Sequence, residues 1–455
     1  MATIICIDFG TSLTKVAASI DGGMPFAIPV GAQAGDPLRQ HAITSTLLLA
    51  RNGKIYVGHR AVDMSFAPPD GPQRRLESMK RWLISADMRE LNRTPVPPEV
   101  NRTGVDFTVG DGLALFLAYV LELTHAYLRS EHSSDALEDV TYRFTRPVFA
   151  KVRARWVDDQ MKCAITCALL LQKHRVEELS GEYEARGVRL ALDACWSETA
   201  SAFNIELPGL EEPIAAGVVQ LSELFSRRSL AAIVDVGAGT TDMAMFVAIQ
   251  PDGGKTIDRA KVLGPPASIA MAGDYLDGVL REMIEEACDF TLTVRDRVEI
   301  DLNIRRWKED IFKFQETVPT LSGGRVLQRV LLHRLEQSPK YVAMQKGLAE
   351  ALFGIFESAA KWIDFFATAK DFPHSEIEIV PSGGGANLPM FRAIDMLRWE
   401  SKPSRRTLRV SVRRPVPDAS WGYEEGFSQL TVALGGAFEE RPRVIGGIEE
   451  RVVQA

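Results

Sequence analysis

The sequence predicts an α/β protein whose two halves are built on one plan. Residues 4–12 read IICIDFGTS and residues 231–242 read AAIVDVGAGTTD. Each segment is an apolar run typical of a strand that ends at an aspartate and continues into a glycine turn with hydroxyl side chains. A third strand-like run, residues 376–381 (EIEIVP), also leads into glycines. One such segment would indicate only a buried strand and its turn, whereas the repetition indicates that each half of the chain offers a hairpin to one shared ligand.

The residue types in the two hairpins suit a phosphate group and a magnesium ion. Backbone N–H groups in a glycine turn can surround anionic oxygens, because only glycine lets the backbone approach so closely. Magnesium prefers oxygen ligands and keeps several waters, so we expect Asp8 and Asp235 to hold the ion through water. No G-x-x-x-x-G-K-[ST] pattern occurs, which excludes a P-loop. The expected phosphate-binding residues are Gly10, Thr11 and Ser12 in the first hairpin and Gly237, Ala238, Gly239, Thr240 and Thr241 in the second.

The third glycine turn, residues 382–389 (SGGGANLP), leads into a helix that we expect to begin near Pro389. Adjacent glycines leave room for a flat base and a ribose against the backbone. The alternative is a flexible loop, although such loops seldom separate so apolar a strand from an amphipathic helix. The residues expected to line the nucleoside are Gly383, Gly384, Gly385 and Asn387.

The order D-x-G-T, D-x-G-x-G-T-x-D and a late G-G-G-x-x-x-P resembles the actin-like ATPase superfamily, and within it the nucleotide-binding domain of DnaK-type heat-shock chaperones. Residues 78–84 (SMKRWLI) are similar to the chaperones' K-R-L-I segment, and residues 197–202 (SETASA) to their E-P-T-A-A segment. The resemblance implies that Lys80 contributes to ATP hydrolysis. It also implies that Glu198 lies near the metal and the attacking water, at a hinge between a strand and a helix.

Three further segments extend the resemblance. Residues 144–148 (FTRPV) take the place of the chaperones' T-V-P-A strand end, and residues 272–277 (AGDYLD), which include the expected nucleotide-binding Gly273, are similar to G-G-E-D-F-D. Residues 431–437 (TVALGGA) are similar to the helix that closes the domain. The resemblance therefore runs from residue 1 to about residue 440 in the family's order.

Some positions depart from the chaperone pattern. Lys15 follows Asp8 at the spacing found in actin-type members, where the chaperones have no lysine, and so could contact the β- or γ-phosphate. Asn387 stands where the chaperones carry the arginine that stacks on adenine, and an amide cannot supply this planar cationic stacking. In the helix that binds base and ribose, Asp310 and Lys313 keep the family's spacing but not the identity of its acid. The pattern thus predicts intact phosphate binding and a changed base site.

The family's fold implies two lobes, each with a ribonuclease-H-like mixed sheet flanked by helices, and a nucleotide in the central cleft. A peptide-binding domain of the chaperone kind needs roughly 150 residues or more, and the tail after the closing helix is too short for one. The expected boundaries are residues 1–37 and 110–228 for the core of lobe I, 38–109 for its insertion, 229–277 and 371–440 for the core of lobe II, 278–370 for a helical insertion, and 441–455 for a short C-terminal tail.

The resemblance implies a Mg-ATP-binding, slowly hydrolysing, chaperone-like or regulatory ATPase that acts as a nucleotide-dependent conformational switch. Asp8 and Asp235 would orient the hydrated magnesium, Lys80 and Lys15 would stabilise charge on the γ-phosphate, and Glu198 or Asp235 would orient the water. Lys15 and the absent peptide domain favour an alternative, a filament-forming actin-like protein. A small-molecule kinase of the same superfamily is a second alternative, which would need a pocket for another substrate. A nucleotide binder that has lost hydrolysis is the third.

Composition narrows the class of protein. With 46% hydrophobic and 25% charged residues, the chain of 455 residues has material for two cores. A net charge of −7 argues against a general nucleic-acid binder. No apolar run approaches the roughly 18 residues of a membrane span, no signal peptide precedes the first strand, and the five cysteines lack the spacing of a metal site. We expect a cytoplasmic protein with an unknown protein partner or co-chaperone, no nucleic-acid or membrane partner, and oligomers as an open possibility.

Overall fold

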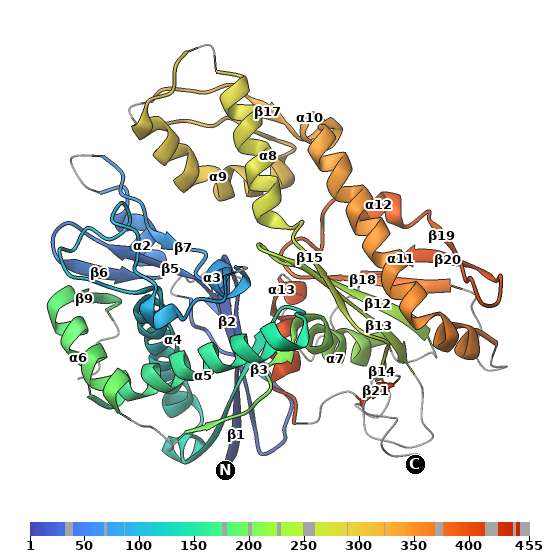
Figure 1. Ribbon diagram of the computed structural model, residues 1–455, viewed down its shortest axis with the longest axis horizontal. Coiled ribbons are helices and arrows are strands. Elements are labelled where there is room, and N and C mark those ends of the chain that lie inside the picture. The colour runs from blue at the N-terminus through green and yellow to red at the C-terminus, as the bar shows by residue number, and fades with distance from the viewer. Residues whose placement is uncertain are drawn as a thin grey trace.

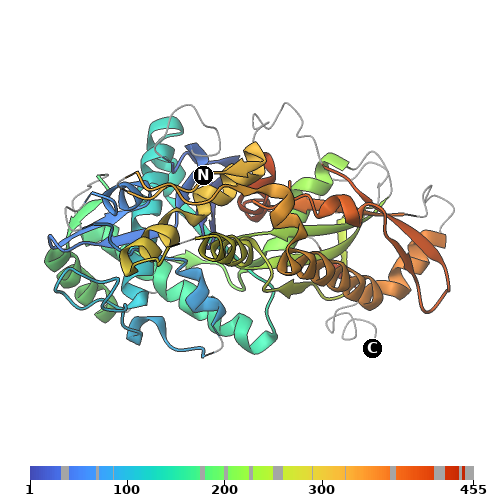
Figure 2. The same cartoon turned by 90° about the horizontal axis from the view of Figure 1, so that it is seen from above.

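The chain forms a mixed α/β fold in which several mixed sheets are flanked by helices (Figure 1). Seen from above, the molecule is elongated, and the N-terminal and C-terminal halves of the chain lie mainly at its opposite ends (Figure 2). This computed structural model describes residues 1–31, 40–67, 71–85, 87–174, 180–198, 203–224, 229–248, 260–288, 290–322, 324–368, 376–414, 426–439 and 443–445.

The first large sheet is built on an antiparallel hairpin of β1 (Ala2–Phe9) and β2 (Leu13–Ile20). β8 (Asp139–Arg146) runs parallel to β1 on its other side, which gives the strand order β10-β8-β1-β2-β3. The shorter strands of this sheet are β3 (Phe26–Ala27), β4 (Ala42–Thr44), β10 (Asn204–Ile205) and β11 (Leu210–Glu211).

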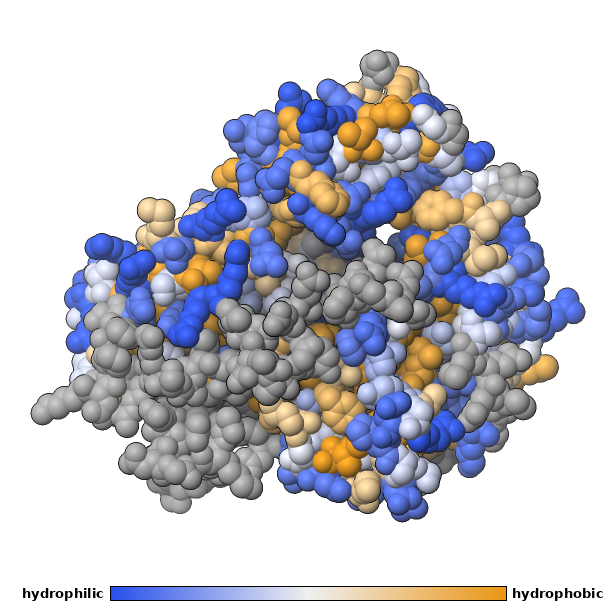
Figure 3. All heavy atoms as spheres, turned by 180° about the vertical axis from the view of Figure 1, so that it is seen from behind, coloured by the Kyte–Doolittle hydropathy of each residue, from blue (hydrophilic) through white to orange (hydrophobic). Residues whose placement is uncertain are grey.

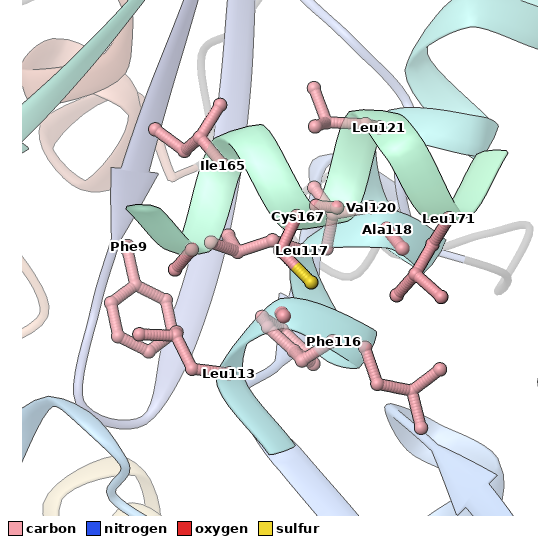
Figure 4. Packing of buried hydrophobic residues seen from close by; sticks show 14 of the residues in the cluster. Phe9, Leu113, Phe116, Leu117, Ala118, Val120, Leu121, Ile165, Cys167 and Leu171 are labelled. Carbon is pink, nitrogen blue, oxygen red and sulfur yellow. The ribbon is translucent and has the colours of Figure 1, made fainter. Parts of the chain in front are cut away.

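Two long helices, α4 (Val109–Glu131) and α5 (Lys151–His174), pack against each other beside this sheet. Figure 4 shows Phe9 of β1 next to Leu113 of α4, and Ile165 of α5 belongs to the same core. α4 begins with a capping box between Thr108 and Asp111. Within the described ranges it alone is long and apolar enough to cross a membrane, which the sequence interpretation did not anticipate, but 72% of its most apolar window is buried inside the fold.

The second large sheet repeats the strand plan of the first. Its hairpin consists of β12 (Ser229–Val236) and β13 (Thr241–Ala248), and β18 (Glu376–Ser382) runs parallel to β12 on its other side. The order β20-β18-β12-β13-β14 therefore matches β10-β8-β1-β2-β3 in the first sheet. The other strands are β14 (Ala260–Leu263), β15 (Ala267–Ile269), β19 (Arg398–Glu400), β20 (Thr407–Val412) and β21 (Arg443–Ile445), which pairs with β14.

Two helices, α7 (Glu212–Leu224) and α13 (Phe427–Gly436), cross each other between the two large sheets (Figure 1). A Cβ at Gly435 would overlap the carbonyl oxygen of Ala215, so only glycine permits this crossing. Arg143 of β8 donates to the carbonyl oxygens of Gly436 and Phe438, which ties the end of α13 to the first sheet. The α7–α13 pair is thus a packed connection between the two halves, which ion pairs such as Arg81 to Asp274 also join.

The remaining elements of the first half form a small sheet with short helices, and those of the second half are mainly helices, of which α11 and α12 pack against the second large sheet. The small sheet contains β5 (Thr46–Leu49), β6 (Lys54–Val57), β7 (Leu76–Glu77) and β9 (Glu182–Glu184), with α2 (His59–Met64), α3 (Lys80–Ile84) and α6 (Ala185–Ser197) nearby. The second half carries α8 (Gly273–Glu286), α9 (Val294–Phe314), β16 (Glu316–Thr317), β17 (Val330–Leu331), α10 (Leu332–Gln337), α11 (Pro339–Thr368) and α12 (Phe391–Ile394). Short 3-10 helices span Leu91–Arg93 and Ser134–Leu137.

The surface seen from behind mixes polar and apolar residues in small groups (Figure 3). Large exposed apolar side chains are spread over several elements, as Leu190 on α6, Val294 on α9 and Phe365 on α11 illustrate. Single exposed apolar residues of this kind are normal for a folded protein. The more informative features are the buried charges between the two large sheets.

Candidate functional site

The tips of the two hairpins are in contact. A methyl group added at Gly239 would lie 2.8 Å from Thr11 Oγ1, closer than side-chain carbons normally approach. Within the second hairpin Gly237 N donates to Thr240 O at 3.0 Å, and in the first a Cβ at Gly10 would overlap Leu13 O. The glycines therefore permit both the tight turns and the approach of one turn to the other.

Each hairpin also places two charged side chains opposite each other just below its tip. In the first, Asp8 pairs in register with Lys15, whose Nζ lies 3.0 Å from Asp8 Oδ2. In the second, Asp235 stands opposite Asp242. All three aspartates are buried. Thr145 at the end of β8 donates its hydroxyl to Asp8 Oδ1 at 3.1 Å, so the neighbouring parallel strand holds this carboxylate in place.

Lys80 enters the same site from α3 and donates a hydrogen bond to Glu212 Oε1, on the first residue of α7. Both side chains are buried, and Asp8 and Asp242 also act on the charge of Lys80. This pair joins the small sheet of the first half to the helix between the sheets. We call the whole group the central cluster, and it consists of Asp8, Lys15, Lys80, Glu212, Asp235 and Asp242.

Burial and mutual repulsion perturb the acids of the central cluster. Burial, together with the charges of Asp8 and Asp242, raises the pKa of Asp235 to about 7. Burial raises the pKa of Glu212 to about 8, with the neighbouring carboxylates adding to this and Lys80 opposing it. The pKa of Asp242 is also raised, mainly by burial. Each shift has the sign expected of a site with too much negative charge.

The buried carboxylate oxygen Asp235 Oδ1 has no hydrogen-bond partner in the described part of the chain, whereas Thr240, Ser268 and Val148 N donate to the Asp242 carboxylate. An unpaired buried acceptor is costly, so Asp235 Oδ1 fits a cation or its water shell. Across the described ranges no three His, Cys, Asp or Glu side chains are arranged to ligate a metal directly. Carboxylate oxygens are ligands that magnesium prefers, and this ion commonly keeps several of its waters.

The structure does not bring Glu198 into the central cluster. Glu198 follows the last residue of α6 and is exposed, whereas Glu212 occupies the position beside Lys80. Residues 199–202, the rest of the segment compared with E-P-T-A-A, lie outside the described residues. The missed signal is the sequence EPIAA of residues 212–216, which fits that pattern better because it keeps the proline and both alanines.

The predicted phosphate-binding hydroxyls are placed differently from one another. Thr11 and Thr240 are buried at the meeting point of the tips, and Ser12 is half-buried. Thr241 is buried in β13 and donates its hydroxyl to Met271 O at 2.6 Å. Its side chain therefore secures the hairpin to the segment before α8, and Thr11 is the better placed hydroxyl for a ligand at the tips.

The third glycine turn lies directly against the second hairpin. Gly383 has φ +76°, and a Cβ there would lie 2.7 Å from Asp235 Oδ1, while a Cβ at Gly385 would overlap the side chain of Val236. Gly384 and Asn387 are exposed. The following helix, α12, spans only Phe391–Ile394 and begins near Pro389 as expected, after a turn at residues 389–390. The turn is thus a close neighbour of the central cluster.

The start of α8 also joins the second hairpin. Gly273 N donates to Gly237 O at 3.1 Å and Asp274 N donates to Ala238 O at 2.7 Å. Lys308 of α9 donates to Gly273 O at 2.9 Å and lies 2.9 Å from Asp277 Oδ1. Lys308 therefore reaches this region from α9, as does Arg305, which lies 3.5 Å from Asp274 Oδ1.

The two residues expected to bind the base and ribose, Asp310 and Lys313, also lie on α9. Asp310 is half-buried, and Lys313 is exposed with its Nζ 5.4 Å from the ring centre of Phe314. The rotation of α9 is set by burial of Ile304, Trp307 and Ile311 in the core, which turns Lys308 toward α8. Sequence spacing alone could not reveal this rotation.

Two cavities open between α3 and α8, and the first of them lies beside the tip of the second hairpin. The first, about 310 Å³, is lined by Gly239 together with Arg81, Asp274 and Tyr275. The second, about 490 Å³, shares Arg81 and Asp274 and continues toward Arg305 of α9. Their walls are held by ion pairs, such as Arg81 to Asp274 at 2.6 Å. Charged surface thus leads from the outside to the tip of the second hairpin.

Comparison with models of known protein families and with curated proteins finds no match to this sequence. The chemistry of the central cluster is therefore the basis on which a function can be assigned.

Proposed function

We propose that this protein binds Mg-ATP between the two hairpin tips, hydrolyses it slowly, and uses the cycle as a conformational switch. The observation that carries the proposal is the contact between Thr11 and Gly239, at the tips of hairpins from two separate sheets, directly above the central cluster. Exposed N–H groups of glycine turns suit phosphate oxygens, and four buried carboxylates beside two lysines suit a divalent ion.

Each residue of the central cluster has a role in this proposal. Asp8 and Asp235 hold the hydrated magnesium ion, which when bound supplies positive charge to the phosphate oxygens. Lys15 and Lys80 provide fixed positive charges next to the phosphates. Glu212, in place of Glu198, orients the attacking water, because it is the acid that lies beside Lys80.

The proposed fold is the two-lobed arrangement of the actin-like ATPase superfamily. Its support is the matching strand order of the two large sheets and the crossing of α7 and α13 between them. Such a connection can act as a hinge, since the two sheets meet mainly through one helix pair. Loss of the γ-phosphate would remove the ligand that both hairpins share, so that opening of the lobes follows hydrolysis.

Calorimetric titration with ATP, in the presence and absence of magnesium, tests this proposal. We expect magnesium-dependent binding that Asp8→Asn weakens at least tenfold, while Asp193→Asn on the surface of α6 leaves it unchanged. Absence of binding of both ATP and ADP by the wild-type protein would refute the proposed function. Equal effects of the two substitutions would refute the assigned site.

A small-molecule kinase is the second candidate, and the cavity next to Gly239 favours it. This cavity of about 310 Å³ lies at the hairpin tip and contains Asp274 and Arg81, so that it could hold an acceptor for the phosphoryl group. The two candidates differ in what stimulates the formation of ADP from ATP. Strong stimulation by one class of polar small molecules supports a kinase, whereas ADP formation at an unchanged rate with any acceptor supports a hydrolase.

A further inference from the structure

A second group of buried charges lies next to the central cluster. Arg146, the last residue of β8, donates from Nε to Asp158 Oδ1 of α5 at 3.1 Å and from one terminal nitrogen to Glu211 Oε1 at 3.5 Å. Arg146 and Asp158 are buried, and burial raises the pKa of both Asp158 and Glu211. We call Arg146, Asp158 and Glu211 the side cluster.

The side cluster is connected to the central cluster through the chain itself. Glu211 pairs in register with Arg146 in the short parallel contact of β11 with β8, and the next residue is Glu212, which begins α7. Thr145, the neighbour of Arg146, donates to Asp8. Two residues after Arg146, Val148 N donates to Asp242 Oδ1 at 2.8 Å. Residues at the end of β8 thus donate to Asp8 and Asp242, and they pair with Glu211, the residue before Glu212.

Stability alone gives little reason for these buried charges. Replacing a buried ion pair by well-packed apolar residues is often neutral or stabilising, because desolvation offsets the attraction. A role in fixing geometry accounts for them better, because a planar guanidinium can hydrogen-bond two carboxylates at fixed angles and a lysine ammonium cannot. Arg146 does this between two elements, and also donates to the carbonyl oxygen of Pro147 at 3.3 Å.

The packing around Asp158 restricts the segment before Glu212 further. Gly209 N donates to Asp158 Oδ1 at 3.2 Å, and a Cβ at Gly209 would lie 3.0 Å from the same oxygen. A Cβ there would also overlap the ring of Phe144. The short segment that leads into α7 is therefore held from both sides, by Asp158 and by Arg146.

We propose that Arg146 is a positioning residue for Glu212. By holding Asp158 and Glu211 together, it fixes the start of α7 and so directs the Glu212 carboxylate toward Lys80 and the reacting water. This inference rests on the proposed function for its effect on hydrolysis, but the geometric coupling of Arg146 to Glu212 is a separate property of the fold.

Hydrolysis kinetics test the positioning role with two variants. Arg146→Lys keeps the charge but loses the fork, and a triple variant (Arg146→Met, Asp158→Asn, Glu211→Gln) removes all charges of the side cluster together, so that no buried charge is left unpaired. We expect kcat to fall at least tenfold in both, with KM for Mg-ATP within about twofold of wild type, and the pH profile of kcat to shift. Unchanged kcat and pH profile in a folded triple variant would overturn the proposal.

A matched control separates positioning from general loss of stability. Arg189 on α6 lies 2.5 Å from Asp111, a buried acid at the start of α4 and away from the central cluster. Arg189→Lys likewise keeps the charge beside a buried acid but loses the fork of the guanidinium, so we expect a lower melting temperature with an unchanged pH profile. A shift of the pH profile as large as that of Arg146→Lys would show that the effect is not specific to the side cluster.

A double-mutant cycle tests the coupling without any hydrolysis. The melting-temperature changes of Arg146→Lys and Glu212→Gln should be non-additive in the double variant, because residues that share one network interact. Additive changes would overturn the inference even if the protein binds ATP. Non-additive changes in a protein that does not bind ATP would leave the coupling in place and refute the proposed function alone.

Discussion

The substitution Asp235→Asn is expected to stabilise the ligand-free protein and to abolish its response to Mg-ATP. Asp235 is buried, one of its oxygens is unpaired in the described part of the chain, and its pKa is raised from 3.8 to about 7. The folded state therefore binds this proton more tightly than the unfolded state does. As a result, stability falls as the pH rises from about 4 to about 7, and the cost remains above that range.

The size of this effect follows from the pKa shift. The rise of the Asp235 pKa from 3.8 to about 7 lowers the free energy of unfolding by about 4 kcal/mol at pH 8 and by less than about 2 kcal/mol at pH 5, relative to a pH below both values. An asparagine keeps the shape of the side chain without the charge, so the variant should gain most of this energy at pH 8. Binding of a magnesium ion should raise the free energy of unfolding of the wild-type protein, since ligands that bind only the folded state stabilise it.

Thermal unfolding at pH 5 and pH 8, with and without Mg-ATP, measures both effects. We expect the variant to melt higher than wild type by several degrees at pH 8 and by less at pH 5, and Mg-ATP to raise the melting temperature of the wild type only. A variant that melts lower than wild type at pH 8, or gains equally at both pH values, would refute this account of Asp235.

Three further predictions follow from the site. Gly239→Ala should raise the dissociation constant for Mg-ATP at least tenfold, because the new methyl group would lie 2.8 Å from Thr11 Oγ1. Gly187→Ala is the control, since a methyl group there would meet no atom within 4 Å. Equal affinities of the two variants would contradict the contact of the tips. Glu212→Gln should lower kcat for hydrolysis about 100-fold while Glu198→Gln leaves it near wild type, since only Glu212 lies beside Lys80; the reverse order would restore Glu198 as the acting acid. Arg81→Ala should speed the release of a fluorescent nucleotide several-fold by removing the ion pair with Asp274 across the cavity, and wild-type release should accelerate with salt; a release rate that neither change affects would exclude this ion pair from closure.

The strand plan and the hairpins could be predicted from the sequence because they depend on local patterns. An apolar run that ends at Asp8 or Asp235 and enters a glycine turn has few structural alternatives, and the structure forms both hairpins with these residues opposite Lys15 and Asp242. The expectation that no apolar run approaches the length of a membrane span does not hold for α4, whose most apolar window is 72% buried inside the fold.

The residues that sequence interpretation missed depend on contacts between distant segments. Glu212 lies 132 residues from Lys80, so its distance along the chain does not single it out, although the EPIAA sequence of residues 212–216 could have indicated it. Lys308 was missed because the rotation of α9 is set by core packing rather than by the polar pattern. The sequence pattern did not indicate Arg146 as a site residue, because its partners Asp158 and Glu211 come from two later elements.

The central claim, that both hairpins bind one Mg-nucleotide, is tested most directly by a crystal structure with magnesium and a non-hydrolysable ATP analogue. The account predicts phosphate oxygens between the turn of Thr11 and the turn of Gly239, with a magnesium ion whose waters contact Asp8 and Asp235. A nucleotide bound elsewhere, or phosphates in contact with only one of the two hairpins, would contradict it.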